Sequence, residues 1–156
     1  MSKPYTDFEP KWVTEPAGEK SWRSIFRWGD PDFYKVPKES LYKMLKKRCA
    51  MNDDDFKDYH GDIGFDDVVL NAPCKFSQDI MTELADIVGE ENLTTEDYPR
   101  LAVAYGKTAY DAMRLREKRV DSLPDVVIYP STSEEIQKIV DLSIEKKIPL
   151  YVYGGG

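Results

Sequence analysis

Three consecutive glycines, Gly154, Gly155 and Gly156, directly follow an apolar run that ends in Val152 and Tyr153. Glycine permits a positive φ and a close approach of a ligand to the main chain, so consecutive amides can surround a phosphate. A Walker loop needs Gly-Lys-Ser/Thr after four spacer residues, and that pattern is missing here. A G-x-G-x-x-G loop follows the first strand of a βαβ unit, where this sequence has no glycine. The residues indicate either a pyrophosphate loop of another kind or a flexible glycine tail.

The elements that would position these glycines lie directly before them. Val126–Tyr129 is a β-branched run after Pro124, and such a run predicts a buried strand. Leu150–Tyr153 predicts a second strand after Pro149. A helix between the two would complete a βαβ unit with a parallel strand pair and a right-handed crossover. The glycines would then lie at the carboxyl end of a parallel strand, where ligands bind in α/β sheets.

The connecting helix is expected over residues 131–147. Its amino-terminal capping box pairs either Ser131 with Glu134 or Thr132 with Glu135. Two lysines close the helix, where positive charge suits the negative end of the helix dipole. The side chains expected on its buried face recur at helical spacing: Ile136, Ile139, Val140 and Ile144.

Further helices are expected upstream. One begins with Ser40 as its cap, a second spans Ser77–Val88 and stops at Gly89, and Tyr98–Lys118 is mostly helical with an interruption near Gly106. In the first helix, the residues that recur at helical spacing are Leu41, Met44, Leu45, Arg48 and Cys49. In the second, an apolar stripe predicts a buried face formed by Ile80, Met81, Leu84, Ile87 and Val88.

Three basic residues in the third helical stretch are spaced seven apart: Arg100, Lys107 and Arg114. A continuous helix would place them on one face. That face is either solvated, which is the common case for a run of charges, or a basic strip that meets an anionic ligand or another part of the same protein.

Other residues capable of chemistry have simpler interpretations. The acidic run around Asp53–Asp55 does not fit a calcium loop, because Lys57 stands where an oxygen ligand belongs; an acidic turn feeding a short helix is expected. Cys49 and Cys74 fit neither a zinc site nor a redox pair, so two reduced cysteines are expected. The single histidine, His60, is expected in a turn, and no metal site is predicted.

The totals limit the class of protein. The chain has 156 residues and a formal net charge of -7, which disfavours nucleic acid as a partner because phosphate neutralisation needs excess Lys and Arg. No apolar stretch is long enough for a transmembrane segment, and no secretory signal is visible, so a cytoplasmic location is the default expectation. Residues 1–36, rich in aromatic side chains, are expected to form an extended arm that docks on a folded body.

The sequence "LPDVVIYPSTSEEIQKIVDLSIEKKIPLYVYGGG" resembles the start of the PCMH-type FAD-binding domain in the vanillyl-alcohol-oxidase group of flavoproteins. The shared features are a Pro-Asp, a strand ending in Pro, a helix beginning near Ser/Thr-x-x-Glu and a strand running into a Gly-Gly-Gly loop. The resemblance implies FAD as cofactor, with the loop on its pyrophosphate. The family usually has Pro at position 152 and Thr or Ser after the glycines. The matching residues of this chain are Val152, Tyr153, Gly154, Gly155 and Gly156.

Upstream, "RLAVAYGKTAYDAMRLREKRVDSLPDVVIYP" and the turn in "FRWGDPDF" resemble alkyl-dihydroxyacetone-phosphate synthases and their bacterial relatives. This resemblance implies an enzyme that exchanges the acyl chain of acyl-dihydroxyacetone phosphate for a fatty alcohol in ether lipid synthesis. The flavin would act as an electron sink without net oxidation. A homodimer and peripheral membrane association are compatible with it.

The expected fold class is therefore α+β, with an amino-terminal arm and helical region over residues 1–120 and the start of an FAD-binding domain over 121–156. Catalytic residues are expected outside residues 1–156, which we interpret as the amino-terminal portion of a longer protein. Alone, this portion is expected to be inactive and to bind FAD weakly or not at all. Two alternatives are an FAD-linked oxidase or dehydrogenase of 2-hydroxy acids, and a non-enzymatic helical module with a flexible glycine tail.

Overall fold

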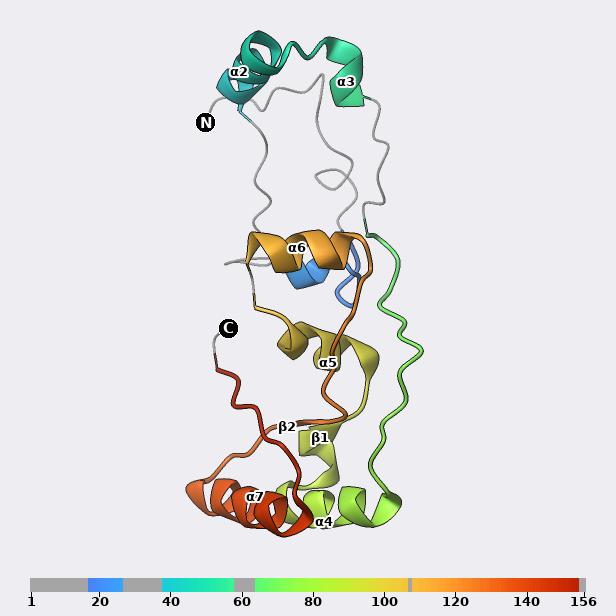
Figure 1. Cartoon of the computed structure of the whole chain (residues 1–156), viewed down its shortest axis with the longest axis vertical. Coiled ribbons are helices and arrows are strands. Elements are labelled where there is room, and N and C mark those ends of the chain that lie inside the picture. The colour runs from blue at the N-terminus through green and yellow to red at the C-terminus, as the bar shows by residue number, and fades with distance from the viewer. Residues whose placement is uncertain (1–16, 27–37, 58–63, 107, 155–156) are drawn as a thin grey trace. The chain divides into compact units, whose positions relative to one another are not determined.

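The computed structural model describes residues 17–26, 38–57, 64–106 and 108–154 of the chain. The chain forms two compact units, Met1–Asp67 and Val68–Gly156, each of which is described by itself. Figure 1 shows the elements along the chain. The expected aromatic arm lies largely outside the described residues, as do His60, Lys107, Gly155, Gly156 and the turn at Gly29–Pro31.

In the first unit, backbone hydrogen bonds pair the segment around Ser21–Arg23 with the segment around Gly64–Asp67. Ser21 and Asp67 form an isolated antiparallel bridge, and the amide of Arg23 donates to the carbonyl of Gly64 at 2.8 Å. Gly64 has a φ of 69°, and a Cβ added there would lie 3.2 Å from the Arg23 amide nitrogen. This position therefore requires glycine for both its conformation and its close backbone contact. Trp22 is buried beside this crossing.

Helix α2 (Glu39–Cys49) confirms the helix expected near Ser40, although Ser40 is not its cap. Lys38 holds the N-cap position without a side-chain hydrogen bond, and its carbonyl accepts from the amide of Leu41 at 2.8 Å. The residues that recur at helical spacing, from Leu41 to Cys49, are exposed or half-buried. Among the described residues of α2, Tyr42 is the one that is buried. Its ring lies edge-on to the ring of Phe56, with the two ring centroids 5.0 Å apart.

Helix α3 (Asp53–Lys57) is the short helix expected from the acidic run. The side chain of Asn52 accepts hydrogen bonds from the amides of Asp54 at 2.8 Å and Asp55 at 3.3 Å. In return, the carboxylate of Asp55 accepts from the Asn52 amide at 2.7 Å. The carboxylates at this helix start are favoured by the helix dipole. Within the described ranges, no group of three or more Asp, Glu, His or Cys side chains could hold a metal ion.

The second unit is helix-rich. Its elements are α4 (Gln78–Val88), the 3-10 turn η3 (Glu90–Asn92), β1 (Leu93–Thr94), α5 (Asp97–Ala104), α6 (Ala109–Arg116), β2 (Val127–Ile128) and α7 (Ser133–Lys146). Helices α5 and α6 confirm the interrupted helical stretch, with the break at Tyr105–Thr108. Helices with a small sheet make the fold α+β, as expected.

Helix α4 has the ends that its sequence predicts. The Ser77 side chain accepts from the amide of Ile80 at the amino-terminal cap, and Gly89 ends the helix with a φ of 89°. Leu84 and Val88 are buried, whereas the other apolar residues of the expected stripe are half-buried. The buried face of α4 lies against α7 (Figure 1).

The βαβ unit expected over residues 126–153 is wrong in this structure. Strand β2 pairs antiparallel with β1, so that Leu93 lies opposite Ile128, and the amide of Tyr129 adds a 2.9 Å bond to the carbonyl of Asn92. Leu150–Tyr153 is described but forms no strand. Strand β1 satisfies one edge of β2 although α5 and α6 separate the two strands along the chain, whereas a parallel pair alone is marginal in water without further strands.

In the described part of the chain, no helix combines the length and the apolar composition that a bilayer-spanning segment needs.

Candidate functional site

The candidate site is the Gly-rich segment, Val152–Gly156, and helix α7 leads into it. Thr132 is the N-cap of α7, and its hydroxyl accepts from the amide of Glu135 at 3.2 Å. The carboxylate of Glu135 accepts from the amide of Ser131 at 2.7 Å. The structure therefore selects the second of the two expected capping boxes, with the glutamate reaching one residue further back than usual.

The carboxyl end of α7 turns the chain sharply toward the Gly-rich segment. Lys147 adopts a left-handed conformation with a φ of 57°, and the amide of Ile148 donates to the carbonyl of Ser143 at 2.8 Å. The amide of Lys147 also donates to the carbonyl of Ile144 at 3.3 Å. These two bonds define a Schellman motif, which usually has glycine at the left-handed position. Pro149 follows, so the helix cannot continue.

The pairing of α4 and α7 holds this turn in place. Ile139, Leu142 and Ser143 are the buried residues of α7. The expected face was partly wrong, because Ile136 and Ile144 are exposed. At the end of the helix the ammonium of Lys146 lies 3.1 Å from the carboxylate of Glu83 on α4. Hydrogen bonding to Glu83, and then to Glu145, raises the pKa of Lys146 above 10.5.

The described part of the Gly-rich segment presents open main chain. Val152 is completely exposed and its neighbour Tyr151 is 97% exposed. A Cβ added at Gly154 would meet no atom within 4 Å. A ligand could therefore approach this backbone without a steric obstacle. No described strand pairs with the segment, so its amides are accessible without being preorganised in a cradle.

Arg100, one of the three basic residues spaced seven apart in the sequence, is buried and connects the segments around the region before β2. Arg100 is 3% exposed; its Nε donates to the carbonyl oxygen of Pro124 and its Nη1 to that of Ala72, both at 2.7 Å. Asp97 lies 3.7 Å from the Arg100 guanidinium, and its other oxygen accepts from the amide of Leu70 at 2.7 Å. Arg100 and Asp97 therefore connect α5 to the chain on both sides of it.

The basic strip does not form as one helical face, because the chain breaks between α5 and α6. Arg100 bonds to other parts of the same protein as a single buried side chain and not as a member of a strip. Lys107 lies outside the described residues, and Arg114 is on α6, with its Nε 3.8 Å from the carboxylate of Asp121. The position of Arg100 in an apolar run, three residues after Asp97, is the sequence signal that could have indicated its burial.

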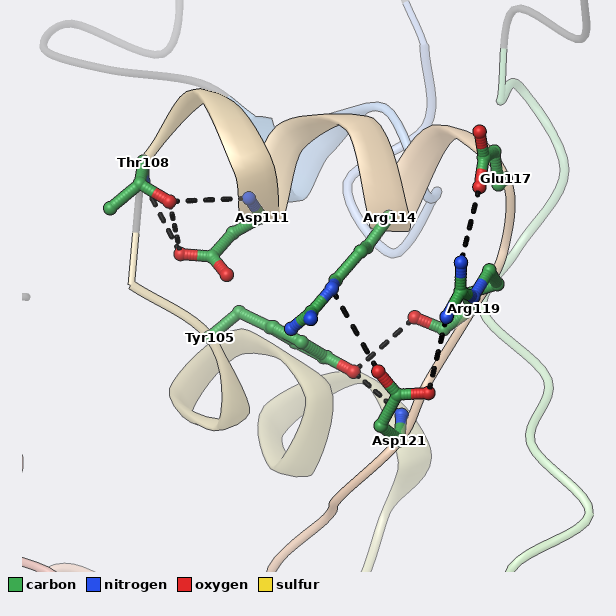
Figure 2. Close-up of polar contacts among 7 residues, drawn as sticks. All are labelled: Tyr105, Thr108, Asp111, Arg114, Glu117, Arg119 and Asp121. Carbon is green, nitrogen blue, oxygen red and sulfur yellow. Dashed lines mark hydrogen bonds and ion pairs between the residues drawn. The ribbon is translucent and has the colours of Figure 1, made fainter.

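A group of hydrogen bonds and ion pairs, which the sequence analysis missed, surrounds Tyr105 and Asp121 (Figure 2). The Tyr105 hydroxyl accepts from the amide of Asp121 at 2.8 Å and donates to the carbonyl of Arg119 at 3.3 Å. The guanidinium groups of Arg114 and Arg119 approach the Asp121 carboxylate at 3.8 and 3.9 Å. These contacts connect the end of α5 to the chain after α6, before the segment that leads to β2.

Helix α6 begins with a complete capping box that Figure 2 also shows. The Thr108 hydroxyl accepts from the amide of Asp111 at 3.2 Å, and the Asp111 carboxylate accepts from the Thr108 amide at 3.4 Å. The helix ends in another left-handed lysine, Lys118, with a φ of 52°. The bond from the Arg119 amide to the carbonyl of Arg114, at 2.9 Å, completes a second Schellman motif.

Three curated proteins resemble this chain, and each is called alkyldihydroxyacetonephosphate synthase. The protein from Caenorhabditis elegans is 31% identical over 109 residues, 65% of this chain and 18% of its own length. The protein from Dictyostelium discoideum is 23% identical over 130 residues, 81% of this chain and 21% of its own length. The Trypanosoma brucei brucei protein is 29% identical over 84 residues, 54% of this chain and 14% of its own length.

The chain thus spans about a fifth or less of the length of these relatives. No protein-family profile matches it. No solved structure matches it significantly. The similarities to these three proteins of one name nevertheless agree with the resemblance seen in the sequence. Over the aligned region, the chain is similar to alkyldihydroxyacetonephosphate synthases.

Proposed function

We propose that this chain is part of an FAD-dependent enzyme that exchanges the acyl chain of acyl-dihydroxyacetone phosphate for a fatty alcohol, forming an ether lipid precursor. The observation that carries the proposal is the common name of three relatives from widely separated organisms, which together align with 54–81% of this chain. The aligned region is a small part of each relative. The activity is therefore proposed for a protein that contains this chain, and no catalytic role is assigned to a residue within it.

The proposed contribution of the chain is to bind the cofactor. Backbone amides of the Gly-rich segment, from Val152 to Gly156, would donate to the pyrophosphate of FAD. Support comes from the open backbone at Val152 and from the free space around Gly154. The bound flavin would supply a reversible electron sink for the exchange. Further strands beside Leu150–Tyr153 would be needed to preorganise the amides, because an unpaired extended segment is not held in one conformation.

The elements before the segment determine where it lies. The Schellman turn at Lys147 and the ion pair between Lys146 and Glu83 fix the exit of α7 against α4. The bonds of Arg100 fix the entry to β2. The chain's own contribution would therefore be a fixed exit from α7, followed by a loop whose main chain is accessible.

The proposal is tested by incubating the complete protein with acyl-dihydroxyacetone phosphate and a radiolabelled fatty alcohol, without an electron acceptor. We expect labelled ether product, released fatty acid and no net flavin reduction. Bleaching of the flavin by lactate-like acids, without ether product, would instead support the alternative 2-hydroxy-acid dehydrogenase. A colourless protein that gains no absorbance from added FAD would support the non-enzymatic helical module.

A further inference from the structure

Residues 68–76 form an irregular segment that leads into α4 and is the green trace in Figure 1. Its even-numbered residues are buried or half-buried, whereas the odd-numbered residues from 69 to 75 are exposed. This alternation is the side-chain pattern of a β-strand. However, residues 69–76 make no backbone-to-backbone hydrogen bond with any residue that the structure describes. The segment therefore resembles a strand that belongs to no sheet.

Three charged side chains of the second unit hold this segment instead, each through one hydrogen bond to its main chain. The bonds join the Leu70 amide to Asp97 at 2.7 Å, the Ala72 carbonyl to Arg100 at 2.7 Å, and the Lys75 amide to Asp125 at 2.9 Å. Asp97 and Arg100 belong to α5, and Asp125 precedes β2. Bonds with one ionised partner are about twice as strong as bonds between neutral groups. A few side chains therefore replace the backbone ladder of a sheet.

We propose that residues 69–76, here called the strap, open and close as one unit while α4 and α7 stay folded. Segments with few buried apolar contacts and few backbone bonds open at a lower free energy than the core does. Every residue of the strap is exposed or half-buried. Because the anchored residues lie two and three positions apart, a displacement of the main chain at one anchor disturbs the geometry at the next. The proposal does not depend on the proposed flavin chemistry.

Opening of the strap would lengthen the free chain that joins the two units. Asp67 is bridged to Ser21 within the first unit, and Leu70 carries the first of the three anchors. The closed strap therefore leaves residues 68 and 69 between these points. In the open strap the free chain would extend from residue 68 to Phe76, because Ser77 is held as the N-cap of α4. The strap would thus control the length of this connection.

Hydrogen exchange of the full chain, followed by NMR, tests whether the strap moves as one unit. Asp125→Ala removes the anchor of the Lys75 amide, and Asp97→Ala removes that of the Leu70 amide. Each variant should accelerate exchange at both amides by about tenfold or more, because loss of a hydrogen bond to a charged group favours the open strap. The informative amide in each case is the one whose own acceptor is unchanged. Amides in the middle of α4 and α7 should keep their exchange rates.

The thiol of Cys74 gives a second readout, because this residue is half-buried on the inward side of the strap. In a chain with Cys49→Ser, both anchor variants should raise the rate at which dithiodipyridine modifies Cys74 by about the same factor as the rate of exchange. In a chain with Cys74→Ser, the exposed Cys49 should react at one rate with and without the anchor changes.

Energy transfer between two fluorophores measures the length of the connection. One fluorophore is placed on Cys49 of the first unit and the other on α7 through Lys138→Cys, in a chain with Cys74→Ser. Asp125→Ala should broaden the distribution of transfer efficiencies, because a longer free chain allows the two labels more separations.

Asp86→Ala is the matched control, since Asp86 is an exposed carboxylate on α4 and its removal changes the net charge as much as either anchor variant does. It should leave exchange in the strap, the reactivity of Cys74 and the transfer distribution unchanged. Asp97 also lies 3.7 Å from Arg100. If Asp97→Ala does not fold, Asp125→Ala still decides the question through the Leu70 amide.

Three results would overturn the proposal. In the first, each variant accelerates only the amide whose acceptor it removes, so that the anchors act separately. In the second, exchange in α4 and α7 accelerates as much as in the strap, so that the segment opens only when the second unit unfolds. In the third, the transfer distribution of Asp125→Ala matches that of the unchanged chain, so that the strap does not control the connection.

Discussion

The guanidinium of Arg100 donates a 2.7 Å hydrogen bond to the carbonyl oxygen of Pro124, 24 residues later in the chain. A second bond of the same length reaches the carbonyl oxygen of Ala72, 28 residues earlier. One buried side chain thereby connects α5 to the segment before α4 and to the segment that enters β2. A nearby bond from the amide of Lys75 to the carboxylate of Asp125, at 2.9 Å, reinforces the same junction.

Replacing Arg100 should destabilise the second unit strongly. Arg100→Met keeps the length of the side chain but leaves two carbonyl groups without their donor, and hydrogen bonds to charged groups contribute about 1.5–3 kcal/mol each. We expect the free energy of unfolding in urea to fall by about 2–4 kcal/mol. Arg116→Met, at an exposed position of α6, should change it by less than about 0.5 kcal/mol. Equal effects of the two variants would show that Arg100 does not hold the junction.

The hydroxyl of Tyr105 should contribute measurably to stability. Tyr105→Phe removes the bonds to the amide of Asp121 and the carbonyl of Arg119 while preserving the buried ring. The expected loss is about 1–2 kcal/mol in the free energy of unfolding, with faster hydrogen exchange at the Asp121 amide. The matched change Tyr110→Phe, at a ring that is 77% exposed, should have no measurable effect. Unchanged hydrogen exchange at the Asp121 amide in the Tyr105 variant would show that the hydroxyl of Tyr105 does not hold this amide.

Glycine at position 147 should stabilise the chain. Lys147 ends α7 in a left-handed conformation, which costs an L-residue with a Cβ roughly 1 kcal/mol relative to glycine. We expect Lys147→Gly to raise the free energy of unfolding by about 0.5–1 kcal/mol. Lys138→Gly, in the middle of the same helix, should lower it by about 1 kcal/mol. The same sign for both changes would mean that the Schellman turn is not formed in solution.

The contact between Lys146 and Glu83 should appear in the pH dependence of stability. The folded-state pKa of Lys146 is raised above its ordinary 10.5, chiefly by Glu83, so the folded chain holds this proton more tightly than the unfolded chain. The resulting stability is fully present below pH 10.5 and is lost as the pH rises through the folded-state value. The effect should be small because the pair is partly exposed and screened by solvent.

The measurement compares urea unfolding of the unchanged chain and of Lys146→Met at neutral pH and at strongly alkaline pH. The unchanged chain should lose its advantage over the variant only in the alkaline range, and about 1 M salt should reduce that advantage. Glu83→Gln should abolish most of the difference, because Glu83 is the main cause of the raised pKa. A difference between the chain and Lys146→Met that stays constant through the alkaline range would rule out this linkage.

Local signals in the sequence predicted the helices of the second unit well. Ser77 and Gly89 bound α4, and Thr132 caps α7, because cap side chains and helix-ending glycines act on their own neighbours. Non-local pairing was not predictable in the same way. Strand β2 pairs with β1, which is only two residues long and has no strong strand pattern of its own.

The same distinction between local signals and non-local contacts applies to the buried faces of the helices. On α4 the expected stripe includes the buried Leu84 and Val88, because a partner helix covers it. On α2 the residues at helical spacing are exposed or half-buried, and the buried residue is Tyr42, whose ring contacts Phe56 of the short helix that follows. Periodicity indicates which residues share a face, but what covers that face depends on elements elsewhere in the chain. The burial of Arg100 was missed for the same reason, since its partners are carbonyl groups far away in the sequence.

The most direct test of the central proposal is the flavin content of the complete protein after a change at Gly154. A side chain there meets no atom within 4 Å in this chain, so Gly154→Val should leave its stability unchanged while obstructing a pyrophosphate on the backbone. We expect the variant to lose bound FAD by at least about tenfold, a difference of about 1.4 kcal/mol, whereas Gly18→Ala, also sterically tolerated, should retain it. Full flavin occupancy in Gly154→Val would contradict the assignment of the Gly-rich segment to the cofactor.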